Sequence, residues 1–243
     1  MVLRDPAVIA YAAAAVVFAV VAVVTWRRRA QSPTIAAALT MVMVGACWWS
    51  VSLAVKVTAT DETVAAIAKI ANFPGASSMV AAFVCLGLAI ARPQWAPRRR
   101  VVAALFVEPV LVTVAAATNP RHLLVYRGAG AAQLTGSAGW MYGPFFWLDH
   151  FYSYLAMSVG VGLIAWAWWK ASPALRAQRL VVLLAALVPF ATNVVFLAGG
   201  FGDILDPTLL GLAVTGVVMA HAIFRRDLLT FTPVARALLT RRI

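Results

Sequence analysis

Few side chains in the long apolar runs of this sequence could do chemistry, and those few are carboxyl, imidazole and amide groups. Glu108 lies in one run, and Asp149 and His150 stand side by side in another. In a third run Asn193 comes four residues after Pro189, where a helix would be kinked. Ionisable groups are costly in an apolar environment, so we treat these groups as candidates for binding a ligand, moving a proton or pairing with another helix.

Most of these candidates are expected at a similar depth below one surface of the membrane. At about 1.5 Å per residue, several polar and aromatic side chains lie roughly 7–13 Å below the same surface, which suggests one outward-facing cavity. Glu108 is the carboxyl expected deepest in the membrane. Trp147 comes two residues before Asp149 in the sequence. The predicted ligand-binding residues are Trp48, Trp49, Glu108, Trp147, Asp149, His150, Tyr152 and Asn193.

Each candidate also has a plainer interpretation. Asp149 is near enough to the end of its run to be hydrated, and His150 and Tyr152 fit an aromatic belt at the membrane surface. Asn193 could instead hydrogen-bond two helices together, and Glu108 could be a neutral partner of a neighbouring helix. His221 is expected to cap a helix end.

Catalytic signatures are absent from the sequence. It has no HExxH, no GxSxG and no phosphate-binding glycine loop, so we expect no enzyme. A covalently bound retinal would need a lysine inside a late run, whereas Lys56, Lys69 and Lys170 stand at run edges. Cys47 and Cys85 fall inside apolar runs, where cysteines behave as small hydrophobic residues, and we expect no metal site. The sequence identifies no cofactor.

The elements that position these groups are membrane-spanning helices. Hydrophobic residues make up 63% of the 243 residues and charged residues 12%, against about 45–50% hydrophobic for soluble domains. Each apolar run approaches or exceeds the ~20 residues that cross a bilayer. We therefore predict an all-α bundle of seven membrane helices in a multi-pass protein of the plasma membrane. The predicted spans are Pro6–Trp26, Pro33–Val55, Phe73–Ala91, Val101–Thr118, Pro144–Trp169, Arg179–Gly199 and Pro207–Phe224.

Basic residues predict the orientation of the bundle. Fifteen of the 20 fall on one side of the predicted spans, and short loops rich in Lys and Arg stay in the cytoplasm. The amino terminus is therefore expected outside and the carboxyl terminus inside. This clustering also accounts for the net charge of +12 without a nucleic-acid partner. The five on the other side are Arg4, Lys56, Lys69, Arg121 and Arg127.

A new helix is predicted after the seventh span. Thr232 followed by Pro233 is a typical helix start, but only about ten residues follow, too few for a helix that is stable alone in water. We interpret residues 1–229 as a seven-helix sensor domain and residues 230–243 as the start of a cytoplasmic signalling helix or linker. Val234 and Leu238 could support a homodimer there.

The order of several short motifs resembles the amino-terminal seven-helix sensor region of membrane histidine kinases. The matching segments are Trp26–Arg29, Trp48–Ser50, Glu108 with Pro109, Asn119 with Pro120 and His122, Pro189 with Asn193, Asp206–Leu209, Arg226–Leu229 and Pro233–Arg236. In that family the region precedes cytoplasmic signalling domains, such as a PAS-type module or the kinase.

This resemblance implies a receptor that detects a small or hydrophobic ligand, or the state of the bilayer, and signals to cytoplasmic kinase or regulatory domains. Asp206, Arg226, Pro233 and Arg236 are then the expected signal-transmitting residues. The rival interpretation is a small transporter or a proton or ion channel that uses Glu108 and Asp149 as relay carboxyls. An intramembrane enzyme is a third possibility.

Overall fold

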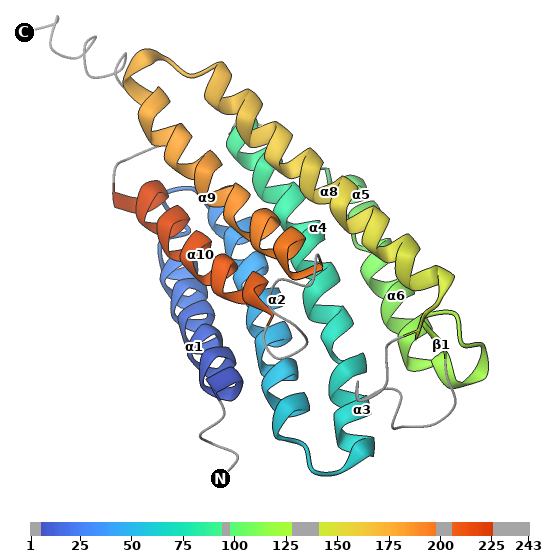
Figure 1. The fold of residues 1–243 in the computed structure, drawn as a ribbon. Helices are drawn as coiled ribbons and strands as arrows, with labels where there is room; N and C mark the ends of the chain where they lie inside the picture. The colour runs from blue at the N-terminus through green and yellow to red at the C-terminus, as the bar shows by residue number, and fades with distance from the viewer. Residues whose placement is uncertain (1–5, 94–97, 128–140, 198–205, 226–243) are drawn as a thin grey trace, which may run out of the picture.

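The computed structural model of the protein describes residues 6–93, 98–127, 141–197 and 206–225, and its long helices run side by side (Figure 1). Six helical segments are long and apolar enough to cross a membrane, and Pro207–Ala222 forms a shorter apolar helix. The all-α seven-helix prediction is confirmed. The six unbroken helices are α1 (Pro6–Arg27), α2 (Pro33–Thr58), α4 (Asn72–Ala91), α8 (Pro144–Trp169), α9 (Pro173–Leu197) and α10 (Pro207–Arg225).

Proline marks where most of these helices begin. The first helical residue of α1, α2, α8, α9 and α10 is a proline in each case. Proline suits this position because its ring presets the helical φ and the missing N–H would have no intrahelical partner there. The helix starts predicted at these prolines therefore follow from local chemistry alone, except for α9, which begins before the predicted Arg179.

The remaining predicted span is divided into α5 (Arg99–Leu105) and α6 (Val107–Ala117), with Phe106 between them. Pro109 has no N–H to donate to the carbonyl four residues before it, which belongs to Leu105. The hydroxyl of Tyr152 on α8 donates to that carbonyl oxygen at 3.2 Å. Tyr152 thus replaces the hydrogen bond that proline removes.

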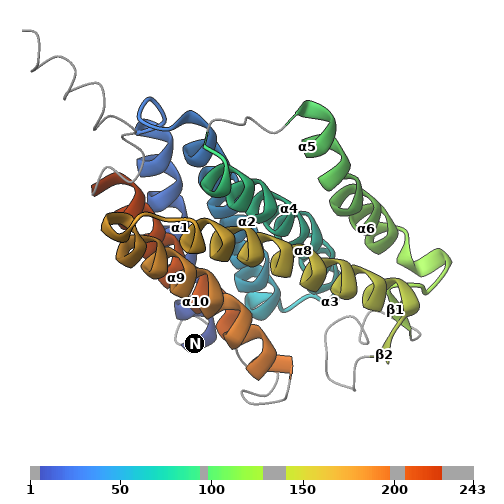
Figure 2. The same ribbon diagram turned by 90° about the horizontal axis from the view of Figure 1, so that it is seen from above.

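Six helices form a closed ring in the order α1, α2, α4, α8, α9 and α10, with α10 packing back on α1. The α5–α6 pair lies outside this ring against α4 and α8 (Figure 2). Phe18, Phe83 and Leu86 are among the side chains buried completely, or almost so, in the core. Valine and leucine side chains cover the outer faces of α1, α6 and α10, as lipid contact requires.

A short helix and a hairpin close one end of the bundle. Helix α3 (Glu62–Ile70) precedes α4 and was not predicted. Asp61 caps it by accepting hydrogen bonds from the backbone of Thr63 and Val64, and these bonds lower the pKa of its carboxyl. Strands β1 (Tyr126–Arg127) and β2 (Met141–Tyr142) pair antiparallel, and the short 3₁₀ helix η2 (Asn119–Arg121) leads into β1. We name this the hairpin end.

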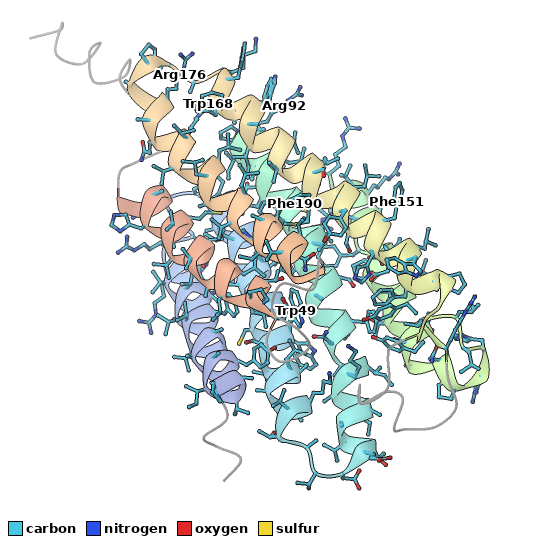
Figure 3. All side chains as sticks on the ribbon, viewed as in Figure 1. Trp49, Arg92, Phe151, Trp168, Arg176 and Phe190 are labelled. Carbon is cyan, nitrogen blue, oxygen red and sulfur yellow. The ribbon has the colours of Figure 1, made fainter. Side chains whose placement is uncertain are left out.

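The opposite end carries basic side chains, and we name it the arginine end. Figure 3 shows Arg92, Trp168 and Arg176 close to this end, with Trp49 and Phe190 nearer the middle of the bundle. The basic residues here whose side chains the structure describes are Arg27, Arg28, Arg29, Arg92, Arg98, Arg99, Arg100, Lys170, Arg176 and Arg179.

Helices α2 and α4 approach each other closely, because Gly45 and Gly75 face each other across their crossing. A Cβ atom added to Gly75 would lie 2.7 Å from the backbone nitrogen of Trp49 and 2.8 Å from the carbonyl oxygen of Gly45. Small residues at such crossings let two membrane helices pack backbone to backbone. This contact holds Trp49 in place.

We expect Gly75→Ala to destabilise the protein by about 1–3 kcal/mol, because the added methyl group forces the two backbones apart. Gly162→Ala on α8 is the matched control, since a Cβ there meets nothing within 4 Å. Thermal unfolding in detergent compares the two variants. Equal melting temperatures would show that the α2–α4 crossing tolerates separation.

Candidate functional site

A cavity of about 270 Å³ opens inside the hairpin end of the ring. Its wall takes residues from α1, α2, α3, α4, α8, α9, α10 and both strands, so no single helix forms it. Trp49 of α2 and Phe190 of α9, labelled in Figure 3, belong to its lining. A concave site built by many elements and lined by mixed polar and apolar groups is typical of small-molecule binding.

Four charged side chains line this cavity, two of each sign. Lys56 comes from α2 and Lys69 from α3, while Asp149 comes from α8 and Asp206 immediately precedes α10. The ammonium group of Lys69 lies 5.7 Å from the ring centre of Tyr126. Burial raises the pKa of the Asp206 carboxyl, while hydrogen bonds with Thr208 and, to a smaller extent, the charge of Lys69 oppose that rise.

Aromatic rings cover the side of the cavity next to the hairpin. Tyr142 stacks on Phe146 at 3.8 Å between ring centres, and Phe146 stacks on His150 at 4.0 Å. Tyr126 lies 6.1 Å from Phe146 and 6.0 Å from Phe73. Burial, with smaller contributions from Tyr142 and Asp149, raises the pKa of Tyr126 well above its ordinary value, so its phenol stays neutral.

Asn119 holds the hairpin over this aromatic wall. Its side-chain oxygen accepts from the backbone N–H groups of Val125 and Tyr126 at 2.9 and 3.1 Å. Its amide nitrogen donates to the carbonyl oxygen of Tyr126 at 3.0 Å. The side chain is almost completely buried, so these bonds are shielded from water.

The predicted ligand-binding residues divide into two equal groups. Trp49, Asp149, His150 and Asn193 line the cavity, whereas Trp48, Glu108, Trp147 and Tyr152 do not. Trp48 and Trp147 are 54% and 59% exposed on the outer face of the bundle. The indole nitrogen of Trp48 donates to the carbonyl oxygen of Ala71 at 2.6 Å and so ties α2 to the junction between α3 and α4.

Glu108 stands behind the cavity wall and contacts it through Asp149. The carboxyls of these two residues interact directly between α6 and α8. Both oxygens of Glu108 and Oδ1 of Asp149 are buried without a hydrogen-bond partner, and Oδ2 of Asp149 lies 3.4 Å from Nδ1 of His150. Two adjacent buried carboxyls repel each other when both are ionised.

Asn193 joins three helices beside the cavity. Its side-chain oxygen accepts from the hydroxyl of Tyr154 on α8, and its amide nitrogen donates to Oγ1 of Thr208 on α10 at 3.1 Å. The start of α10 is held further by Asp206, whose backbone N–H donates to the hydroxyl of Tyr11 at 2.9 Å. Asn193 thus links helices and also lines the cavity, and its role in ligand binding stays a prediction.

Several lining residues were not among those predicted from sequence. Four of the five tyrosines of the chain, Tyr11, Tyr126, Tyr142 and Tyr154, line the cavity, as do two of its three lysines. The sequence analysis used the lysines to predict orientation and to argue against covalent retinal, but not as ligand-binding residues. A signal was present in α2, where Trp49, Leu53 and Lys56 recur at the spacing of one helical face.

The described residues contain no group of three or more His, Cys, Asp or Glu side chains that could hold a metal ion. Of the residues expected to transmit a signal, Asp206 lies in the cavity wall. The other three, Arg226, Pro233 and Arg236, lie outside the described residues.

We expect Asn193→Ala to lower stability by about 1–2 kcal/mol, because two interhelical hydrogen bonds are lost at once. Thr192→Val is the matched control in the same turn, since the Thr192 hydroxyl donates only to carbonyl oxygens of its own helix. Chemical or thermal unfolding in detergent measures both. If the two variants lose equal stability, Asn193 does not hold α8, α9 and α10 together.

Comparison with known proteins identifies the family. No curated protein matches the chain. The family model described as the N-terminal 7TM region of histidine kinase matches residues 10–233, a range that includes most of α1 and every other described helix. The chain therefore belongs to the family of N-terminal seven-transmembrane regions of histidine kinases, the membrane-embedded sensor region of these signalling proteins.

Proposed function

We propose that this sensor region binds a small ligand in the cavity at the hairpin end and signals by displacing α10 toward the cytoplasmic domains that follow in its family. One observation carries the proposal. Helix α10 contributes to the cavity wall through Thr208 and Leu212, just after Asp206, and it ends at the arginine end. A molecule in the cavity would thus touch the helix that leads out of the bundle.

Polar contacts favour movement of α9 and α10 as one unit. Asn193 bonds Thr208 near the cavity, and Oγ1 of Thr215 donates to the carbonyl oxygen of Ala185 at 2.6 Å further along. Near the arginine end, Nε2 of Gln178 donates to the carbonyl oxygen of Ala222 at 3.2 Å. These three bonds join the two helices along most of their length.

On its other side α10 packs on α1 and α2 largely through apolar contacts, such as Gly216 against Met43. The hydrogen bond between Tyr11 and the backbone of Asp206 is the polar link described there. A ligand moves an equilibrium only by its differential affinity for two arrangements. In this proposal the two arrangements differ in how the α9–α10 pair sits against α1 and α2.

The orientation belongs to the same proposal. The excess of arginine and lysine at one end supports a cytoplasmic arginine end, with the hairpin end and its cavity facing outside. The cavity would then sample molecules outside the cytoplasm or in the outer leaflet. The carboxyl-terminal end of α10 would enter the cytoplasm, where a kinase domain can receive the signal.

Single cysteines test this orientation in cells. In a Cys47→Ser, Cys85→Ala background, we expect Thr63→Cys on α3 to react with a membrane-impermeant maleimide added to intact cells, and Ser172→Cys between α8 and α9 to stay unlabelled. Both positions are exposed. After the membrane is permeabilised, both should react. Labelling of Ser172→Cys alone in intact cells would reverse the orientation.

Filling the cavity tests the signalling function. The whole chain is joined after Ile243 to a cytoplasmic histidine-kinase core, and autophosphorylation is measured in membranes. We expect Ala76→Phe, which places a ring in the cavity wall, to change the rate about fivefold or more in one direction. Ala13→Phe on the exposed face of α1 is the size-matched control and should leave the rate unchanged.

Two outcomes would count against the sensor. Equal autophosphorylation rates for Ala76→Phe, Ala13→Phe and the unaltered chain would show that filling the cavity does not affect the kinase output. Proton or ion flux through the purified chain in liposomes, lost in Glu108→Gln, would favour the transporter or channel instead. Against a relay, the other described carboxyls, Asp61, Glu62 and Asp206, all lie at the hairpin end.

A further inference from the structure

We propose that the ligand of this cavity is a small zwitterion, a molecule that carries an ammonium group and a carboxylate or phosphate close together and has room for a modest apolar substituent. The inference rests on the proposed function in that it takes the cavity to be the sensor's ligand site. It goes beyond that function by naming the chemistry of what is sensed.

Three buried side-chain atoms that lack hydrogen-bond partners belong to residues of the cavity lining. They are Nε1 of Trp49, Oδ1 of Asn72 and Oδ1 of Asp149. Leaving such a group unpaired costs about 1–3 kcal/mol each, so a ligand that pairs with it gains affinity. A ligand that pairs with all three atoms must donate hydrogen bonds to Asn72 and Asp149 and accept one from Trp49. One molecule with an ammonium group and an anionic oxygen meets all three requirements.

Glu108 interacts with Asp149 from behind the cavity wall. Asp149 is only 7% exposed and is the member of the pair that lines the cavity. A cation entering the cavity would therefore meet the Asp149 carboxyl.

The charges on the wall favour a ligand with no net charge. Lys56 and Lys69 balance Asp149 and Asp206, and Lys69 already interacts with Asp206 and with the ring of Tyr126. A simple amine would be repelled by the two lysines, and a simple carboxylate by the two aspartates. Burying a net charge in a membrane protein is costly unless it is paired, whereas a zwitterion can pair both of its charges.

Each charge of a zwitterion has a suitable surface in the cavity. The ammonium group fits the hairpin side, where the carboxyl of Asp149 lines the cavity. The anionic group fits the side formed by α2, where Trp49 and Lys56 supply N–H donors.

The volume of the cavity and its apolar lining residues limit the size and the substituent of the ligand. Its volume of about 270 Å³ is that of roughly nine water molecules at about 30 Å³ each, which suits a molecule the size of leucine or phosphoethanolamine. Met79, Met157, Phe190 and Leu212 line it as well. These side chains would cover an apolar substituent.

Thermal unfolding of the whole purified chain in detergent tests the ligand class. The probes are the free amino acids, one at a time, and phosphoethanolamine. We expect at least one to raise the melting temperature in a saturable way, because a ligand that binds only the folded state stabilises it. For the strongest binder, the matching amine without the anionic group and the matching acid without the ammonium group should each bind at least tenfold more weakly.

Charge-removing variants locate the site. We expect Asp149→Asn and, separately, Lys56→Gln to weaken binding of that zwitterion at least tenfold. Glu62→Gln and Lys170→Gln are matched controls, since both side chains are exposed and lie outside the cavity lining. If Asp149→Asn fails to fold, Lys56→Gln and the amine and acid probes decide the question.

The outcomes separate this proposal from the proposed function. If no zwitterion stabilises the chain, or if a singly charged counterpart binds as well, the ligand class is wrong, even where Ala76→Phe still alters kinase output. If the zwitterion binds but Ala76→Phe has no effect on output, the site stands and the sensor mechanism fails. Binding of phosphoethanolamine alone, with higher stability in phosphatidylethanolamine than in phosphatidylglycerol nanodiscs, identifies a lipid headgroup as the source.

Discussion

Water is excluded from the hydrocarbon layer, so each polar group of a spanning helix needs a partner within the protein, and the packing of this bundle follows from that need. Ser50 on α2 donates to the carbonyl oxygen of Tyr11 on α1 at 2.8 Å, and Thr25 and Thr40 bond each other at 2.8 Å. Tyr152 satisfies the carbonyl group that Pro109 leaves open. These bonds fix helix neighbours where apolar contact alone would let them slide.

The cavity is the place where this pairing is incomplete. Among the described residues six buried side-chain atoms lack a hydrogen-bond partner, and three of the six belong to residues that line this cavity. A site that leaves polar groups unpaired is less stable when empty, and a ligand that pairs them recovers that stability. In the proposed function, the unpaired groups that make the empty cavity less stable also contribute to the free energy of ligand binding, and α10, which lines the cavity, responds to the ligand.

The fold was largely predictable because its strongest signals are local. Apolar runs of sufficient length and prolines at helix starts predicted the seven helices, and the structure confirms them. Helix α3 was missed because its nine residues are too few to stand out beside the apolar α4. The division of one span at Phe106 was missed. Pro109 indicates that the Leu105 carbonyl loses its helical hydrogen bond, but not whether another group replaces it. The group that does so, the hydroxyl of Tyr152, lies 47 residues away in the sequence.

By itself, then, the sequence determined a seven-helix membrane bundle, its basic end and a short list of polar groups at similar depth. Only the tertiary structure decided which of them share a cavity. Asp149 and Asn193 line it, whereas Trp48 and Trp147 face outward. The physical reason is that a spanning helix is apolar on nearly every side, so lipid-facing and protein-facing residues look alike in sequence. Partners such as Tyr11 and Asp206, 195 residues apart, become neighbours only when the ring of helices closes.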